Sequence, residues 1–271
     1  MTPSLLDNPL VLSVLFYPRP DRPGHSALPQ VHDGAIPVAN EIALGYRLYA
    51  HQPDSPLILY FHGNGEIAGD HDGIAEEYRR VGVSLLVVDY RGYGWSTGRP
   101  LLSTLLSDAE AVLPALPAVL AGAGLEPEAP LFVMGRSLGS APAIHLAHAR
   151  PGRFKGLIVE SGFAHVLMLL ARLGLPANLL ADIPDPIGNL RKVERLDLPL
   201  LVIHGERDSL IPVAHGQALY DASPATHKRL LRIPGAGHND LLLLGARQYF
   251  DAVQAFVTET TNGGGTPRGN G

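Results

Sequence analysis

The chain has 271 residues, a formal net charge of −5 at pH 7 and no cysteine. Its length suits one large domain, which buries about three quarters of the surface that the unfolded chain exposes. The absence of cysteine excludes disulfide bonds, thiolate zinc sites and cysteine nucleophiles. The charge is mildly acidic and no basic stripe could follow a phosphate backbone, which argues against nucleic acid as a partner.

The two ends of the chain carry no strong structural signal. The first twenty residues contain an apolar run but lack the basic start and the small-residue cleavage site of a secretion signal. No segment holds the roughly 18 uninterrupted apolar residues of a membrane-spanning helix, so we expect no integral membrane segment and a cytoplasmic location. Residues 1–260 are expected to form one domain, and the glycine-rich stretch 261–271 a disordered tail.

Short apolar runs alternate with helix-like stretches through the middle of the chain. The expected strands are 57–62, 84–90, 131–135, 154–160, 198–205 and 226–234. Most of these runs are apolar throughout, as is typical of parallel strands covered on both faces. The expected helices between and after them are 67–81, 103–121, 138–149, 212–222 and 240–258. Pro114 and Pro117 weaken the second of these helices.

Residues 30–39 and 40–50 predict an antiparallel pair of strands at the edge of the sheet. With the alternating elements that follow, they predict an α/β fold with a mostly parallel central sheet flanked by helices. One interval breaks the alternation, because almost forty residues separate Glu160 from the strand that begins near Leu198. We expect a small helical cap at about 163–195, although a crossover helix with an irregular loop explains the length equally well.

The pattern G-x-S-x-G, typical of serine hydrolases, occurs around Ser96 and again around Ser137. A nucleophile elbow needs a strand that runs directly into a sharp turn, and a helix that starts at the serine. Both elements surround Ser137. The strand before Ser96 ends near Tyr90, and Gly98 follows the serine where a helix should begin. The sequence therefore predicts Ser137 as the nucleophile and places Ser96 in a glycine-rich turn.

A serine hydroxyl needs a histidine as base, and the histidine needs an acid to orient it. In this arrangement the acid and then the histidine follow the serine, each in a loop after a later strand. Asp208 follows the strand 198–205 and His238 follows the last strand, so both should lie at the same sheet edge as the serine. Glu160 and Glu206 are alternative acids; a loop aspartate, however, can turn inward over the sheet end.

Other histidines are expected to be packing or surface residues, because none of them follows the last strand: His145, His148, His165 and His204. The oxyanion hole should be formed by two backbone amides, those of Leu138 and Asn64. His62, in the same loop as Asn64, is expected to brace that loop. The segment 69–73, with two aspartates around a histidine, is expected to be an exposed turn and not a metal site.

The combined motifs resemble the α/β-hydrolase superfamily and, within it, the Bem46-like branch, which includes α/β-hydrolase domain-containing proteins 12, 13 and 17. The matching segments, spread over residues 15 to 240, are "LFYPRP", "LYFHGNGE", "VVDYRGYGWSTGRP", "MGRSLGSAPAIHLA", "IVESGF", "HGERDSLIP" and "GAGHND". The resemblance implies Ser137, Asp208 and His238 as the catalytic residues and a structural role for the loop around Ser96. It also implies activity on esters, thioesters or lipid acyl chains.

The expected function is hydrolysis of a small-molecule carboxylic ester or thioester through an acyl-enzyme, without a cofactor or a metal ion. The apolar segment 163–181 suggests an apolar acyl group. A peptidase or amidase with the same triad is one alternative, although no acidic pair for a substrate amine stands out. A ligand-binding protein without catalysis is the other, although every catalytic member is present.

Overall fold

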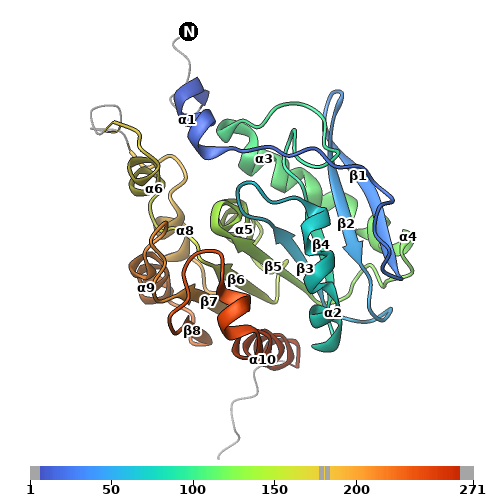
Figure 1. Cartoon of the computed structure of the whole chain (residues 1–271). Coiled ribbons are helices and arrows are strands. Elements are labelled where there is room, and N and C mark those ends of the chain that lie inside the picture. The colour runs from blue at the N-terminus through green and yellow to red at the C-terminus, as the bar shows by residue number, and fades with distance from the viewer. Residues whose placement is uncertain (1–6, 177–179, 181–183, 263–271) are drawn as a thin grey trace, which may run out of the picture.

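The structure is a computed structural model that describes residues 7–176, 180 and 184–262. Eight strands form one sheet in the order β1-β2-β4-β3-β5-β6-β7-β8 (Figure 1). In chain order the strands are β1 (Val31–Ala39), β2 (Ile42–Tyr49), β3 (Leu57–Phe61), β4 (Ser84–Val88), β5 (Leu131–Arg136), β6 (Gly156–Glu160), β7 (Leu200–Gly205) and β8 (Lys228–Ile233). The pairs β1–β2 and β2–β4 are antiparallel and the other pairs are parallel. The expected strands and the antiparallel pair at the sheet edge are confirmed.

The described α-helices are α1 (Pro9–Leu15), α2 (Asp72–Arg80), α3 (Leu102–Val112), α4 (Leu116–Gly122), α5 (Ser140–Ala149), α6 (Val166–Arg172), α8 (Asn189–Val193), α9 (Val213–Ala222) and α10 (Leu241–Thr261). Short 3-10 turns precede α2, α4 and α5. The expected helix 103–121 is interrupted at Pro114, where a 3-10 turn separates α3 from α4. The sequence reading missed α1, which begins at Pro9 and is capped by the Asn8 side chain.

Helices cover both faces of the sheet (Figure 1). Successive side chains of a strand point to opposite faces. Tyr60 of β3 and Phe132 of β5 therefore join the apolar cluster under α2 and α10. Phe61 and Val133, one residue further along each strand, join the cluster under α3, α5 and α9. This burial on both faces explains why the strand sequences are apolar throughout.

The segment Leu102–Gly122, which contains α3 and α4, has the length and hydropathy of a membrane span, and 33% of it is buried. These criteria are also met by core helices of water-soluble domains. In the structure α3 packs against α5 and the edge strand β1. The expectation of no integral membrane segment stays a prediction.

The interval in which a helical cap is expected contains α6 and α8. The Asp185 side chain links the two helices, because it accepts hydrogen bonds from the amides of Val166 (3.0 Å) and Gly188 (2.8 Å). Residues 177–179 and 181–183 of this interval lie outside the described residues, so the cap stays a prediction. Residues 1–6 of the expected domain and 263–271 of the expected tail also lie outside them.

Two glycines allow β5, α5 and β3 to meet at the carboxyl end of the sheet. A Cβ atom on Gly139 would overlap the carbonyl oxygen of Phe61 at the end of β3. A Cβ atom on Gly135 would overlap the carbonyl oxygen of Gly139. Both overlaps involve backbone atoms that cannot turn away, so any larger residue would force the elements apart.

We therefore expect Gly139→Ala to lower the free energy of unfolding by about 1–3 kcal/mol or more, because the added methyl group overpacks a backbone contact. Urea unfolding measures this change. The matched control is Gly122→Ala at the end of α4, where an added Cβ meets nothing within 4 Å. Alanine there should leave stability within about 1 kcal/mol of wild type or raise it. Equal losses in the two variants would contradict the role given to the Gly139 contact.

Candidate active site

The chain turns sharply between β5 and α5, and Ser137 lies at the turn. Its φ angle is +52°, a left-handed value that costs a non-glycine residue energy and persists only when the surroundings hold it. The Ser140 hydroxyl donates to the Ser137 carbonyl oxygen at 2.7 Å. Together with the two close glycine contacts, this bond holds the strained turn that a nucleophile elbow requires.

The structure brings Ser137, Asp208 and His238 together from three loops. His238 Nε2 lies 2.9 Å from Ser137 Oγ, and His238 Nδ1 lies 2.6 Å from Asp208 Oδ2. The second Asp208 oxygen accepts hydrogen bonds from the amides of Leu210 (2.9 Å) and Ile211 (2.7 Å). With the Nδ1 hydrogen donated to the carboxylate, Nε2 has its lone pair free for the serine proton. The arrangement can activate a serine hydroxyl.

His204 is a further contact of Asp208 that the sequence reading did not find. It is buried, as expected of a packing residue. Its Nε2 atom lies 2.7 Å from the Ile211 carbonyl oxygen and 3.4 Å from Asp208 Oδ2. Burial alone would raise the pKa of Asp208, but the hydrogen bonds from His204 and His238 outweigh it and hold the pKa well below its usual range. Asp208 is therefore ionised near neutral pH.

The alternative acids have other surroundings. Glu160 is buried and accepts hydrogen bonds from Arg136 Nε (3.0 Å) and from the Tyr249 hydroxyl (2.7 Å). Glu206 is exposed. Within the described ranges, Asp208 is the only carboxylate within 4 Å of the His238 ring nitrogens.

Ser96 lies in a different environment from Ser137. Its hydroxyl accepts a hydrogen bond from the Gly45 amide (2.8 Å) and donates to the Asp89 carbonyl oxygen (3.3 Å). The following residue, Thr97, accepts from the Ala43 amide at 2.9 Å. These bonds attach the loop after β4 to strand β2, so the G-x-S-x-G match around Ser96 has a structural role.

The loop after β3 carries the predicted oxyanion donor Asn64. Its side-chain oxygen accepts hydrogen bonds from the Tyr17 amide and the Tyr93 hydroxyl, each at 2.7 Å. In the part of the chain that the structure describes, the Asn64 amide donates to no protein group. His62 is buried, with Nδ1 2.8 Å from the Gly63 carbonyl oxygen, and it braces the loop as expected. The side chain of Asn64 is thus tied down while its backbone N–H stays available.

The segment 69–73 differs from the exposed turn that was expected. It spans the 3-10 turn and the first residues of α2, and His71 is buried there. Asp70 pairs with Arg19, whereas Asp72 accepts from the Tyr49 hydroxyl at 2.7 Å. The expectation holds for Asp70 and Gly73, which are exposed, and is wrong for His71, because a charged sequence was read as solvated whereas this histidine packs in the interior.

A second polar cluster, also missed in the sequence, lies beside the His238 loop. Arg136, the last residue of β5, donates from Nε to Glu160 and pairs through Nη1 with Glu66. Its Nη2 atom donates to the carbonyl oxygen of His238 (2.8 Å) and to Asn239 Oδ1 (2.9 Å). The guanidinium group therefore binds three segments that surround the elbow.

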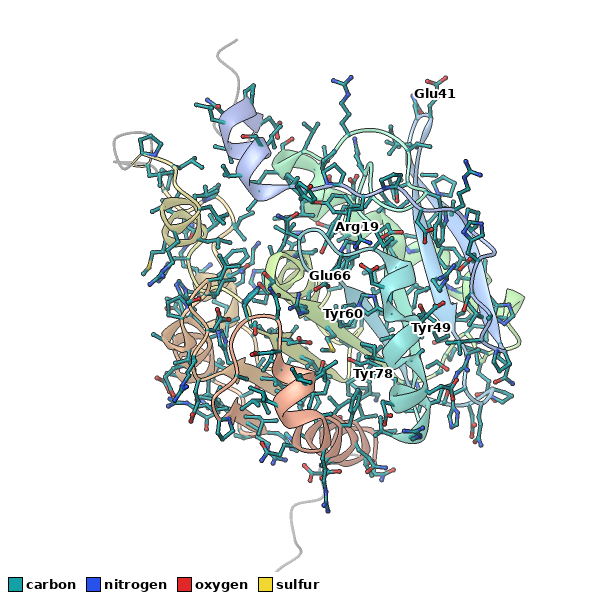
Figure 2. The ribbon with its side chains drawn as sticks, viewed as in Figure 1. Arg19, Glu41, Tyr49, Tyr60, Glu66 and Tyr78 are labelled. Atoms are coloured by element: carbon teal, nitrogen blue, oxygen red, sulfur yellow. The ribbon has the colours of Figure 1, made fainter. Side chains whose placement is uncertain are left out.

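A polar cavity of about 200 Å³ adjoins this cluster and is lined by Tyr60, Glu66, Glu160 and His238 among others. Figure 2 labels Tyr60 and Glu66, two of the residues that line this cavity. Burial raises the pKa of Glu160, and the attraction of Arg136 offsets this only in part. Burial would also raise the pKa of Glu66, but Arg136, the two nearby histidines His71 and His62 and the Gly63 amide together outweigh it, and the pKa falls. Arg136, Glu66 and Glu160 thus form an ion-pair cluster that is largely shielded from solvent.

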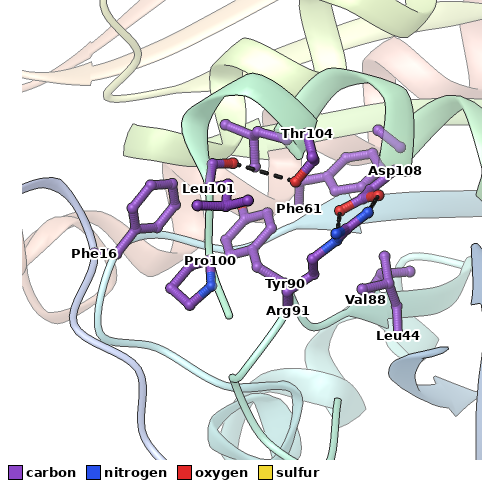
Figure 3. Close-up of a pocket in the computed structure, with 12 residues that line it drawn as sticks. Phe16, Leu44, Phe61, Val88, Tyr90, Arg91, Pro100, Leu101, Thr104 and Asp108 are labelled. Atoms are coloured by element: carbon purple, nitrogen blue, oxygen red, sulfur yellow. Dashed lines mark hydrogen bonds and ion pairs between the residues drawn. The ribbon is translucent and has the colours of Figure 1, made fainter. Parts of the chain in front are cut away.

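An apolar pocket between the loop after β4 and α3 is shown in Figure 3. It is lined by Phe16, Phe61, Tyr90 and Leu105 among others, and the Arg91–Asp108 ion pair closes one side. Its volume of about 10 Å³ is roughly that of one water-sized probe, too small for an acyl chain. We assign it no ligand.

Comparisons with known proteins show the family of the chain. The sequence model of the family described as serine aminopeptidase, S33, matches residues 52–187 and 188–242. The chain belongs to this family of α/β hydrolases. An uncharacterised protein of Mycobacterium tuberculosis, Rv2307c, is 33% identical over 87% of this chain and 82% of its own length. Human α/β-hydrolase domain-containing protein 17B is 30% identical over 74% of this chain and 66% of its own length. The expected resemblance is confirmed.

Solved structures show the same hydrolase fold. The esterase Pf2001 of Pyrococcus furiosus superposes with a TM-score of 0.71 at 18% identity, over 90% of this chain and 98% of that one. A monoacylglycerol lipase of Paleococcus ferrophilus gives a TM-score of 0.58 at 17% identity, over 81% and 99%. The predicted α/β-hydrolase fold, with a mostly parallel sheet flanked by helices, is confirmed.

The lowered pKa of Asp208 predicts how the free energy of unfolding of this hydrolase changes with pH. Because the folded pKa lies below the unfolded value of about 3.9, ionised Asp208 stabilises the fold fully above that pH. This contribution is lost as the pH falls toward the folded pKa. The free energy of unfolding of wild type should therefore exceed that of Asp208→Asn at pH 7, and the difference should shrink below about pH 4.

Urea unfolding at a series of pH values between 7 and 3 measures this difference. The matched control is Asp251→Asn, because Asp251 is an exposed aspartate on α10. Its substitution should change stability by no more than about 0.5 kcal/mol at any pH. A difference between wild type and Asp208→Asn that stays constant down to pH 3 would contradict the assigned environment of Asp208.

Proposed function

We propose that this hydrolase cleaves a carboxylic ester or thioester through an acyl-enzyme on Ser137. The observation that carries the proposal is the unbroken chain of hydrogen bonds from Asp208 through His238 to the Ser137 hydroxyl. The strained backbone of the serine supports it, because a positive φ angle at a non-glycine residue needs a surrounding structure that maintains it.

In the proposed reaction, His238 Nε2 takes the proton of the Ser137 hydroxyl while Oγ attacks the carbonyl carbon of the substrate. The resulting imidazolium is stabilised by ionised Asp208 and then protonates the leaving alkoxide or thiolate. Water, deprotonated by His238, then attacks the acyl carbon; the bond to Ser137 Oγ breaks, His238 returns the proton to Oγ, and the acid is released. No step requires a cofactor or a metal ion.

The tetrahedral intermediates carry a negative oxygen that needs hydrogen-bond donors. The proposed donors are the backbone amides of Leu138 and Asn64. Leu138 follows the nucleophile directly, and the Asn64 side chain is anchored by Tyr17 and Tyr93. Anchoring favours this role because an oxyanion hole works through donors that are already in position when charge develops.

A peptidase with the same triad is the alternative, and the family description names an aminopeptidase. An aminopeptidase needs free carboxylates for the substrate amine. Glu66 and Glu160 form an acidic pair near His238, but Arg136 occupies both of them. Structural neighbours described as an esterase and a monoacylglycerol lipase also favour an ester or thioester.

An active-site fluorophosphonate tests the nucleophile. We expect the probe to label wild type and Ser96→Ala at similar rates and to leave Ser137→Ala unlabelled, because of these two serines Ser137 is the one whose hydroxyl contacts a histidine. Intact-protein mass spectrometry measures the adduct. Ser96→Ala is the matched control, since it removes the hydroxyl of the other G-x-S-x-G match. A labelled Ser137→Ala protein would remove the basis of the proposal.

A substrate panel tests the bond that is cleaved. We expect p-nitrophenyl esters and acyl thioesters to be hydrolysed with kcat/KM values at least about 100-fold above those of the matching anilides, since an amine is a poorer leaving group. The acyl chains should range from two to sixteen carbons, with Ser137→Ala as the blank. Faster turnover of aminoacyl anilides than of the esters would favour the peptidase alternative.

A further inference from the structure

The residue directly before the nucleophile, Arg136, donates hydrogen bonds to four different protein groups. Arg136 has 13% of its side chain exposed, and all three of its guanidinium nitrogens bind protein groups. The partners are Glu66 in the loop after β3, Glu160 at the end of β6, and two groups of the loop after β8. The guanidinium group thus joins the carboxyl ends of β3, β5, β6 and β8.

Glu66 extends this connection to the predicted oxyanion loop. One of its carboxylate oxygens binds Arg136, and the other accepts a hydrogen bond from the Gly63 amide at 2.8 Å. The guanidinium also packs against this loop, because a Cβ atom on Gly63 would lie 2.6 Å from Arg136 Nη1. The ion pair between Arg136 and Glu66 therefore also holds the Gly63 backbone N–H, one residue before Asn64.

At its other end Arg136 holds the backbone of the catalytic histidine. Its Nη2 atom donates to the His238 carbonyl oxygen at 2.8 Å, and to the Asn239 side chain at 2.9 Å. Glu160 accepts a hydrogen bond from Arg136 Nε, and its other carboxylate oxygen accepts one from the Tyr249 hydroxyl at 2.7 Å. The base and the predicted oxyanion donor, which are far apart in the sequence, thus share one rigid connector.

We propose that Arg136 is a positioning residue for this reaction: bridged by Glu66, it fixes the distance between His238 and the Asn64 amide. The inference rests on the proposed function. Arg136 does not touch the Ser137 hydroxyl or the His238 ring, so it acts through the loops that it holds. Charge complementarity favours the role, since one buried cation sits between two carboxylates and a carbonyl oxygen.

The test compares Arg136→Met with Arg91→Met in steady-state ester hydrolysis. Arg91 is the matched control, because it has 15% of its side chain exposed and forms a similar ion pair with Asp108 (Figure 3). Displacing the base or the oxyanion donor by an ångström should lower kcat of Arg136→Met by about 10- to 100-fold, with KM within about threefold of wild type. Arg91→Met should lose thermal stability but keep kcat within about twofold.

Arg136→Lys should not restore kcat, because one ammonium group cannot reach the four acceptors that the planar guanidinium binds. The labelling rate with the fluorophosphonate should fall together with kcat, since that reaction uses the same base. If kcat of folded Arg136→Met equals that of Arg91→Met, or if only KM changes, the inference is wrong while the proposed function stands. Labelling that persists in Ser137→Ala would overturn both.

If Arg136→Met fails to fold, the variant Glu66→Ala tests the positioning role of Arg136 instead. Glu66 has 25% of its side chain exposed, so Glu66→Ala should disturb folding less. It removes the bridge to the Gly63 amide and should also lower kcat by about tenfold without a matching change in KM. Where all variants fold, the double variant Arg136→Met/Glu66→Ala should lose about as much kcat as Arg136→Met alone, because both substitutions break the same connection. A wild-type kcat in Glu66→Ala, or fully additive losses, would overturn the inference.

Discussion

Helix α5 reaches its position only because the backbone of Gly139 lies directly against the carbonyl oxygen of Phe61 at the end of β3. This contact brings the start of the helix over the centre of the sheet. In the short turn between β5 and α5, Ser137 adopts a left-handed backbone conformation. The close backbone approach is thus accompanied by backbone strain at Ser137. The sharp turn directs the serine hydroxyl toward the loops of neighbouring strands.

The rest of the site follows from the direction of the strands. Parallel strands end at the same edge, so the loops after β3, β5, β7 and β8 meet around the serine. Hydrogen bonds from different donors hold three of these loops, those after β3, β7 and β8. Amides of its own loop hold Asp208, the Tyr17 and Tyr93 groups hold Asn64, and Arg136 holds the backbone of His238. The groups that hold the site are therefore spread over several loops, and a single five-residue motif does not reveal them.

The sequence predicted the parts of the fold that depend on local signals. Apolar runs gave the strands, and the context of strand, turn and helix separated Ser137 from Ser96. The chain order of Asp208 and His238 indicated their place at the sheet edge, and the structure brings both to the serine; their catalytic role stays a prediction.

Long-range polar contacts were not predictable in the same way. Arg136 occupied a position that the G-x-S-x-G pattern leaves open, and its partners Glu66 and Glu160 are distant in the chain. His71 was read as exposed because its neighbours are charged. In each case the deciding partner comes from another strand or helix, and no periodicity in one segment records it.

The strand order has a further consequence at the two free edges of the sheet. β8 forms one edge, and Lys228, Arg229 and Arg232 lie on it within six residues. β1 forms the other edge and contains Pro37, where the pairing with β2 shifts register. Positive charges, a proline and an irregular register all hinder the addition of a strand from another molecule. The arrangement protects an apolar eight-stranded sheet against edge-to-edge aggregation.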